Sequence, residues 1–129
     1  MTDADPDLTA PAEPTGDLAR LTALIREFSV ERDWEQFHDP KSLVLALVGE
    51  VGELAELVQW LPADGARAHF DDPARRQRAG EEIADVLVYL LRLADVLGVD
   101  VLQATLDKQA AARRRFPVDA VHGVAPHKA

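Results

Sequence analysis

Cysteine is absent from this chain of 129 residues. Its absence excludes disulfides, thiolate metal sites and a cysteine nucleophile, and it fits a cytoplasmic protein. Long apolar runs are also missing, because Leu43–Val48 and Val86–Leu91 fall far short of the ~18 residues of a membrane span. The acidic, proline-rich first residues are the reverse of a secretory signal, so we expect neither export nor membrane association.

Positive charge is scarce as well. The chain carries 14 basic and 23 acidic residues, which gives a formal charge of -9. Such a chain repels the phosphate backbone of nucleic acids and anionic membranes, so neither is expected as a partner. An acidic protein that handles phosphates needs a cation as an intermediary, which directs attention to divalent metal sites.

Apolar residues are plentiful by contrast and make up 47% of the chain, enough for one folded domain. We expect this domain at residues 17–117, between a flexible acidic tail at 1–16 and a second flexible tail at 118–129. Strand alternation is nowhere sustained, whereas apolar residues recur at helical spacing between the tails. The sequence therefore predicts an all-α fold.

Capping residues divide the folded part into four predicted helices. Asp39 and Asp72 are each followed by proline, and a capping residue before proline is typical of a helix start. Asp17 and Asp100 can cap the other two helices. The helices predicted in this way cover residues 17–33, 39–61, 73–97 and 100–116.

The connections between these helices suggest how they pack. The stretch 63–72 contains Asp-Gly and is predicted to be a loop. The link at 98–100 is short and contains Gly98, a residue that favours a helix end. A link this short predicts that the third and fourth helices fold back on each other, which completes a four-helix bundle.

Two pairs of acidic residues lie on apolar helix faces. On a helical wheel at ~100° per residue, Leu54 falls within ~40° of Glu50, and Glu53 lies ~60° from it. In the next long helix Glu82 and Asp85 are three residues apart, which brings their Cβ atoms to about 5–6 Å. A buried carboxylate must be neutral, paired with a cation or bound to a metal. We therefore expect all four acids to be buried and to converge.

Such a cluster concentrates about four negative charges, which raise one another's pKa values unless a cation is present. All-oxygen ligands favour Mg²⁺, with Mn²⁺ able to substitute. The alternative for either pair alone is an ordinary solvated helix face. A di-iron bundle is excluded, since it needs Glu-x-x-His on its core helices and the four histidines lie in predicted loops or tails.

These acids also carry a resemblance to a known family. GEVGELAE followed by EIAD resembles the MazG-like all-α nucleoside triphosphate pyrophosphohydrolases, whose pattern is E-x-x-E, a gap and then E-x-x-D. The segments WEQFH, DVLVYLLRLA and RRRFPV are similar to the dCTP pyrophosphatase branch. The resemblance covers about residues 18–119.

The resemblance implies a protomer of four helices that assembles as a dimer or a tetramer, with active sites between protomers. The four acids would carry Mg²⁺, and water would attack the α-phosphorus of a nucleoside triphosphate to give a monophosphate and pyrophosphate. Glu53 and Glu81 are the candidates for the general base. Two alternatives stay open: a house-cleaning enzyme of broader specificity, and a nucleotide-binding bundle without catalysis.

Substrate-binding positions also follow from the resemblance. Trp34 and Trp60 would stack on the base, Tyr89 would lie near the sugar, and Lys108 would contact the triphosphate. Core filling is the alternative for the aromatic residues, and helix-dipole complementarity is the alternative for Lys108. The predicted substrate-binding residues are Trp34, Glu35, Gln36, Phe37, His38, Trp60, Tyr89 and Lys108.

At two positions the chain departs from the branch pattern. Ile25 stands where the branch usually has a histidine that contacts the base, and Ala112 stands in place of an asparagine. Hydrogen bonds distinguish one base from another better than stacking does. The resemblance therefore predicts a nucleotide pocket and leaves its preference for cytosine open.

Overall fold

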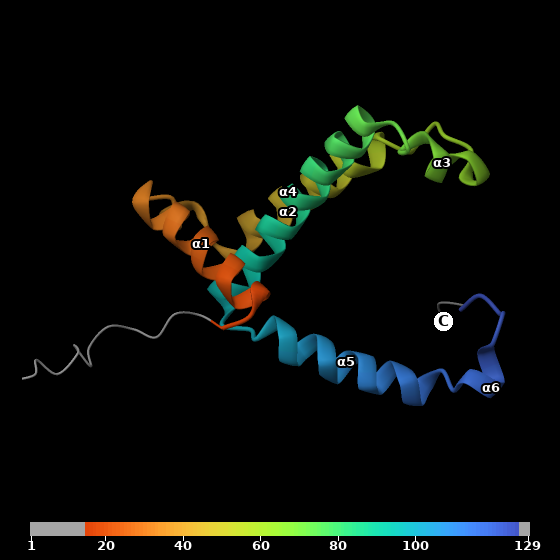
Figure 1. The fold of residues 1–129 in the computed structure, drawn as a ribbon. Helices are drawn as coiled ribbons and strands as arrows, with labels where there is room; N and C mark the ends of the chain where they lie inside the picture. The colour runs from red at the N-terminus through yellow and green to blue at the C-terminus, as the bar shows by residue number, and fades with distance from the viewer. Residues whose placement is uncertain (1–14, 127–129) are drawn as a thin grey trace, which may run out of the picture.

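The computed structural model describes residues 15–126, which form helices joined by turns and contain no strand (Figure 1). The predicted all-α class is thus confirmed for this part of the chain. Residues 1–14 of the expected N-terminal tail and 127–129 of the expected C-terminal tail lie outside it. The elements are α1 (Asp17–Glu31), η1 (Glu35–Phe37), α2 (Pro40–Glu56), α3 (Ala63–His69), α4 (Pro73–Leu97), α5 (Val101–Arg115) and α6 (Val118–Val121).

Three aspartates begin helices as their positions predict. The side chains of Asp39, Asp72 and Asp100 accept hydrogen bonds from the backbone N–H three residues ahead, at 2.9, 3.0 and 3.0 Å. These bonds satisfy N–H groups that have no partner within the helix. The prediction for Asp17 is wrong, because Gly16 occupies the capping position and Asp17 is the first helical residue, where its charge suits the helix dipole.

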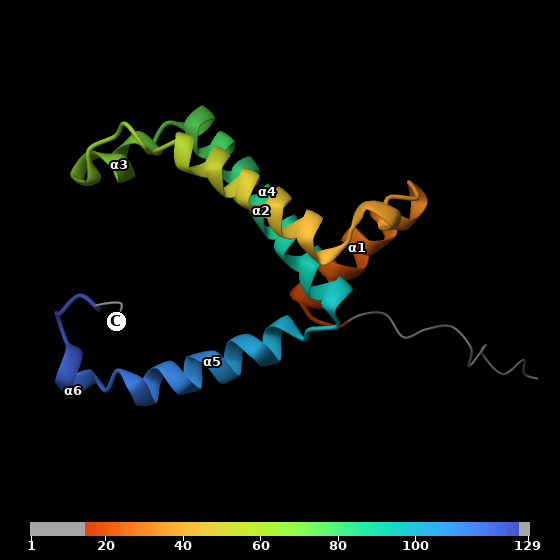
Figure 2. The same ribbon diagram turned by 180° about the vertical axis from the view of Figure 1, so that it is seen from behind.

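The longest packed contact is between α2 and α4, which lie side by side and antiparallel, with α1 against the C-terminal part of α4 (Figures 1 and 2). Leu43 of α2 and Leu91 of α4 are 1% and 2% exposed and are the buried hydrophobic residues of the described chain. Many other apolar side chains remain exposed, for example Leu45 and Val48 on α2, each at 62%. The described part of the chain therefore buries a small core relative to its apolar content.

The expected fold-back of the last long helix is wrong. Gly98 ends α4 in the left-handed conformation, with φ of 68°, as predicted. After this turn, however, α5 points away from the α2–α4 pair and does not pack along it (Figures 1 and 2). A short link brings two helix ends together but does not decide their angle. The apolar residues Leu102 and Leu106 of α5 stay more than half exposed.

Other boundaries also differ from the predictions. Helix α2 ends at Glu56 rather than Leu61, because the next turn tightens and Leu57 N–H bonds to the carbonyl three residues back. The predicted loop 63–72 contains α3, in which Asp-Gly is accommodated within the first helical turn. One helical turn, α6, also forms within the expected tail at 118–129.

Among the described residues, no helix combines the length and the apolar character that crossing a membrane requires.

Candidate active site

The structure brings the four predicted acids together. Glu50 and Glu53 come from α2, and Glu82 and Asp85 come from the facing stretch of α4. One carboxylate oxygen from each residue lies within 4.8 Å of the corresponding oxygens of the other three. The antiparallel contact between α2 and α4 produces this convergence, since each helix presents two acids one turn apart.

The burial of the acids is uneven. Glu82 is 6% exposed and Glu50 is half-buried, whereas Glu53 and Asp85 are exposed in the protomer. The expectation that all four are buried is therefore wrong. The helical wheel places the pairs on the apolar side, but Glu53 and Asp85 lie at the margin of the α2–α4 contact rather than within it. The cluster thus has a buried side and an open side.

Two oxygens in the cluster are orphaned. Oε2 of Glu50 and Oε2 of Glu82 are buried and have no hydrogen-bond partner. The other oxygen of Glu82 accepts from Nε of Arg78 at 3.1 Å. A buried carboxylate oxygen without a partner costs free energy. A divalent cation between the carboxylates would supply the missing partner, so these residues fit a metal ion with a preference for oxygen ligands.

Electrostatic repulsion within the cluster supports the same conclusion. The negative charge of Glu50 raises the pKa of the Glu53 carboxyl, and the charge of Glu82 adds to this effect. Arg78 is the salt-bridge partner of Glu82, but its side chain is 62% exposed, so water screens its charge. A bound cation would relieve the repulsion and lower the pKa of Glu53.

The predicted aromatic residues are spread along the molecule. Trp34 precedes α2 and packs edge-to-face on Phe28, with ring centroids 5.7 Å apart. Trp60 follows α2 and is 88% exposed. The 17 residues of α2 span about 25 Å at the rise of an α-helix. The structure thus places the two tryptophans at opposite ends of α2 and does not bring them together within the chain. Tyr89 lies half-buried on α4, one turn beyond Asp85.

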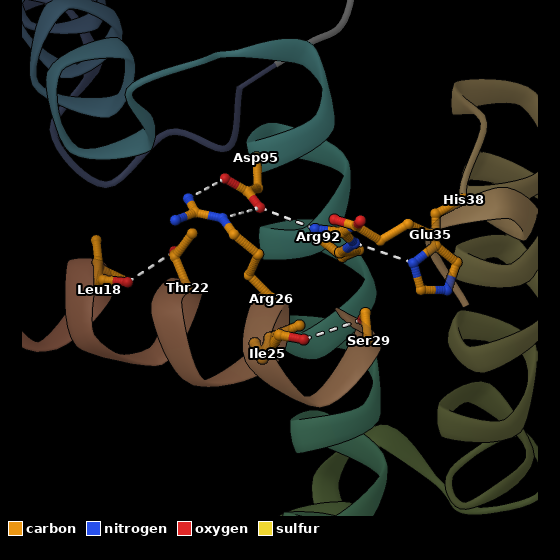
Figure 3. A network of polar contacts seen from close by, with 9 residues as sticks. All are labelled: Leu18, Thr22, Ile25, Arg26, Ser29, Glu35, His38, Arg92 and Asp95. Atoms are coloured by element: carbon orange, nitrogen blue, oxygen red, sulfur yellow. Dashed lines mark hydrogen bonds and ion pairs between the residues drawn. The ribbon is translucent and has the colours of Figure 1, made fainter. Parts of the chain in front are cut away.

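The segment Trp34–His38 follows α1 and contains η1. Gln36 is turned back toward the end of α1 and donates to the carbonyl of Asp33 at 2.9 Å. Phe37 is 61% exposed. His38 and Glu35 face α4, where they contact Arg92 (Figure 3). Lys108 is exposed on α5, the helix that points away from the carboxylates.

Sequence reasoning missed the polar network around Arg92. Although it is charged, this residue of α4 is only 5% exposed, and it contacts Asp95, His38 and Glu35 (Figure 3). Arg26 of α1 pairs with the far side of Asp95. The sequence did contain one indication of this network, the single arginine in the apolar run VLVYLLRLA. A charged residue on an apolar helix needs hydrogen-bond or ion-pair partners.

Comparison with known protein families and solved structures identifies the class of protein to which the chain belongs. Residues 38–117 match the family model of the MazG nucleotide pyrophosphohydrolase domain. A crystal structure of a pyrophosphatase from Archaeoglobus fulgidus superimposes with a TM-score of 0.74 at 33% identity, over 84% of this chain and 99% of that one. The chain therefore belongs to the MazG family of nucleotide pyrophosphohydrolases.

Within this class the chain is similar to proteins named dCTP pyrophosphatase 1. It is 50% identical to the protein of Bos taurus over 115 residues, which are 88% of this chain and 66% of the bovine protein. It is 51% identical to the protein of Homo sapiens over 106 residues, or 81% of this chain and 61% of the human protein. The chain thus spans slightly less than two thirds of the length of these relatives.

Proposed function

We propose that the protein hydrolyses a deoxynucleoside triphosphate, with dCTP the first candidate, to the monophosphate and pyrophosphate. The observation that carries this proposal is the cluster of four carboxylates with two buried, unpartnered oxygens. The names of the curated relatives support dCTP. Ile25 and Ala112 argue against a strict preference, because neither can hydrogen-bond to a base through its side chain.

Mg²⁺ is the proposed cofactor, and Mn²⁺ the proposed substitute. Carboxylate oxygens at this spacing suit a hard cation that keeps some of its waters. Glu50, Glu53, Glu82 and Asp85 would hold it. When bound, the cation stabilises charge on the phosphoryl oxygens and lowers the pKa of coordinated water.

In the proposed reaction, a side chain of the protein accepts one proton from the attacking water. A water oxygen forms a bond to the α-phosphorus, the bond to the α–β bridging oxygen breaks, and pyrophosphate leaves. Glu53 is our candidate for the group that accepts the water proton, because it lies on the exposed side of the cluster, where water can reach its carboxylate. Glu81 is less suited, since it lies outside the cluster and accepts a hydrogen bond from Gln77.

We propose further that a second copy of the chain completes the site, in a dimer or a tetramer. Trp34 and Trp60 lie at opposite ends of α2, so a base stacked between them needs one tryptophan from each copy. The exposed apolar residues of α2 and α5 offer a surface for this contact. The same contact between copies would allow Lys108 of α5 to contact the triphosphate. A cytoplasmic location stays a prediction of the sequence.

A substrate panel tests the activity. Pyrophosphate release would be measured with Mg²⁺ for the four dNTPs, the four NTPs and 5-modified dCTPs, with EDTA as the metal-free arm. We expect release from dCTP and its loss with EDTA. Equal rates on all dNTPs would favour the broader enzyme, and binding without release would favour a bundle that is not catalytic.

Two variants connect this activity to the cluster. Glu50→Gln and Asp85→Asn should remove nearly all turnover and leave the helical circular dichroism signal unchanged. Glu56→Gln is the matched control, because Glu56 is exposed at the end of α2 and lies outside the cluster. Wild-type rates in the Glu50 or Asp85 variant would reject the assignment.

A further inference from the structure

The network around Arg92 joins three parts of the chain. The guanidinium of Arg92 donates from Nε to Nδ1 of His38 at 2.9 Å and from a terminal nitrogen to Asp95 at 2.9 Å. Its other terminal nitrogen lies 3.4 Å from Glu35. Arg26 of α1 bonds to both oxygens of Asp95. Figure 3 shows Arg92 between Asp95 and His38, with Arg26 approaching from α1.

The bond between Arg92 and His38 has a definite direction. A guanidinium has only donors, so Nδ1 of His38 must be the acceptor and carries no proton. The single proton of the neutral ring is then on Nε2, which becomes its one donor. The opposite tautomer, and the doubly protonated ring, would turn an N–H toward the N–H of Arg92.

The charges around the ring favour the same state. Burial lowers the pKa of His38 below its ordinary value, and the positive charge of Arg92 lowers it further, while Glu35 acts in the opposite direction. Asp95 and Arg26 lie behind Arg92, where Asp95 is shared by the two arginines. His38 therefore stays neutral at pH 7.

We propose that Arg92 is a positioning residue for the nucleotide pocket: it seats the segment from Glu35 to His38 on α4 and fixes His38 as the tautomer with its proton on Nε2. The ring then presents a fixed donor to an acceptor oxygen of the nucleotide. This inference rests on the proposed function and on the family resemblance, which implies that the segment 34–38 lines the pocket. It assigns roles to Arg92 and to the Nδ1 side of His38 that the carboxylate pattern does not supply.

The first test is spectroscopic and needs no turnover. In ¹⁵N NMR of the His38 ring at neutral pH, the wild type should show an unprotonated Nδ1 and a protonated Nε2. In Arg92→Gln the two tautomers should mix. Arg26→Gln is the matched control, because it weakens the α1–α4 ion pair without touching His38, and the tautomer should persist. A proton on Nδ1 in the wild type, or an unchanged pattern in Arg92→Gln, overturns the proposal.

The second test is kinetic. Arg92→Gln should raise KM for the nucleotide roughly tenfold, the effect of losing one oriented hydrogen bond to a charged or polar group, with a smaller change in kcat. A loss confined to kcat contradicts the positioning role.

His38→Gln keeps the proposal testable if Arg92→Gln does not fold. The glutamine amide nitrogen can replace Nε2 as donor, so KM should stay near the wild-type value. His38→Ala should raise KM as Arg92→Gln does. Equal KM in the glutamine and alanine variants would show that no donor is used. The NMR result stands even if no nucleotide is hydrolysed, so the two proposals fail separately.

Discussion

Glu82 shows how one side chain can report on metal binding. It is 6% exposed, and one of its oxygens has no partner. Glu82→Gln removes one negative charge from a cluster in which the charges repel one another. We expect this variant to be no less stable than the wild type in EDTA, because the repulsion falls by one charge.

The same variant should lose its response to metal. Thermal unfolding of the wild type should shift to higher temperature on addition of Mg²⁺, since a ligand that binds only the folded state stabilises it. In Glu82→Gln this shift should shrink or vanish, and turnover should fall on the order of 10²-fold or more. A Mg²⁺-induced shift equal to that of the wild type would argue against a metal at Glu82.

The ion pairs of Asp95 should make the free energy of unfolding depend on pH. The hydrogen bond from Arg26 lowers the pKa of Asp95 below its ordinary value, with Arg92 adding to the effect. A carboxyl with a lowered folded-state pKa stabilises the fold above its unfolded pKa of ~3.9, and this contribution is lost as pH falls through the folded value. Urea unfolding should therefore show Asp95→Asn less stable by about 1–3 kcal/mol at pH 6. The difference should narrow below pH 3. A constant difference at both pH values would contradict this ion pair.

At the scale of single elements, Asp72 allows the contribution of one capping residue to stability to be measured. Its side chain accepts from the N–H of Arg75 at 3.0 Å and caps α4. Asp72→Ala should lower the free energy of unfolding by about 1 kcal/mol, measured by urea denaturation. Asp71→Ala is the control, since Asp71 precedes the cap and the structure gives its side chain no role at this helix start. A similar loss in both variants would point to charge rather than capping.

The helix starts were predictable because their causes are local. An aspartate three residues before an N–H acts within one turn, so Asp39, Asp72 and Asp100 could be recognised from neighbouring residues alone. The direction of α5 has no local cause, because it depends on which apolar surface the helix covers. The network of Arg92 joins residues more than 50 positions apart, and no spacing rule connects such residues.

The carboxylate cluster could be predicted from the sequence only in part. Two acids one turn apart on each helix could be read from spacing, and an antiparallel contact was enough to bring the pairs together. Residue spacing did not predict which of the four acids are buried. Exposure depends on where a residue lies across the width of the helix contact, and a helical wheel resolves this only to within about one side chain.

For the whole molecule, the separation of the two tryptophans leads to a mixing experiment. If each site takes Trp34 from one copy and Trp60 from the other, Trp34→Ala and Trp60→Ala should each raise KM. A mixed oligomer of the two variants contains some sites with both tryptophans intact, so part of the activity should return. The measurement is turnover after unfolding and refolding the variants together.

The control for this experiment is each variant refolded alone, which should stay impaired. Return of activity only in the mixture would demonstrate a site shared between copies. No return, with mixed oligomers shown to form by affinity-tag capture, would place both aromatic contacts within one copy or outside the site.

The projecting α5 leads to a prediction about assembly. Leu102 and Leu106 are 57% and 54% exposed in one protomer. Leu106→Asp would place a charge in any interface that covers this face, at a cost of several kcal/mol. Sedimentation should show a smaller species than the wild type, with lower thermal stability. Unchanged sedimentation would show that this face of α5 stays in solvent.

The antiparallel contact of α2 and α4 leaves the four acids within a single chain, while the tryptophans lie a helix length apart. Ion affinity and nucleotide affinity should therefore respond differently to dilution. If the base is bound between copies, a dissociated chain should still bind the ion but no longer bind the base. Stabilisation by Mg²⁺ would then persist at dilutions where turnover is lost.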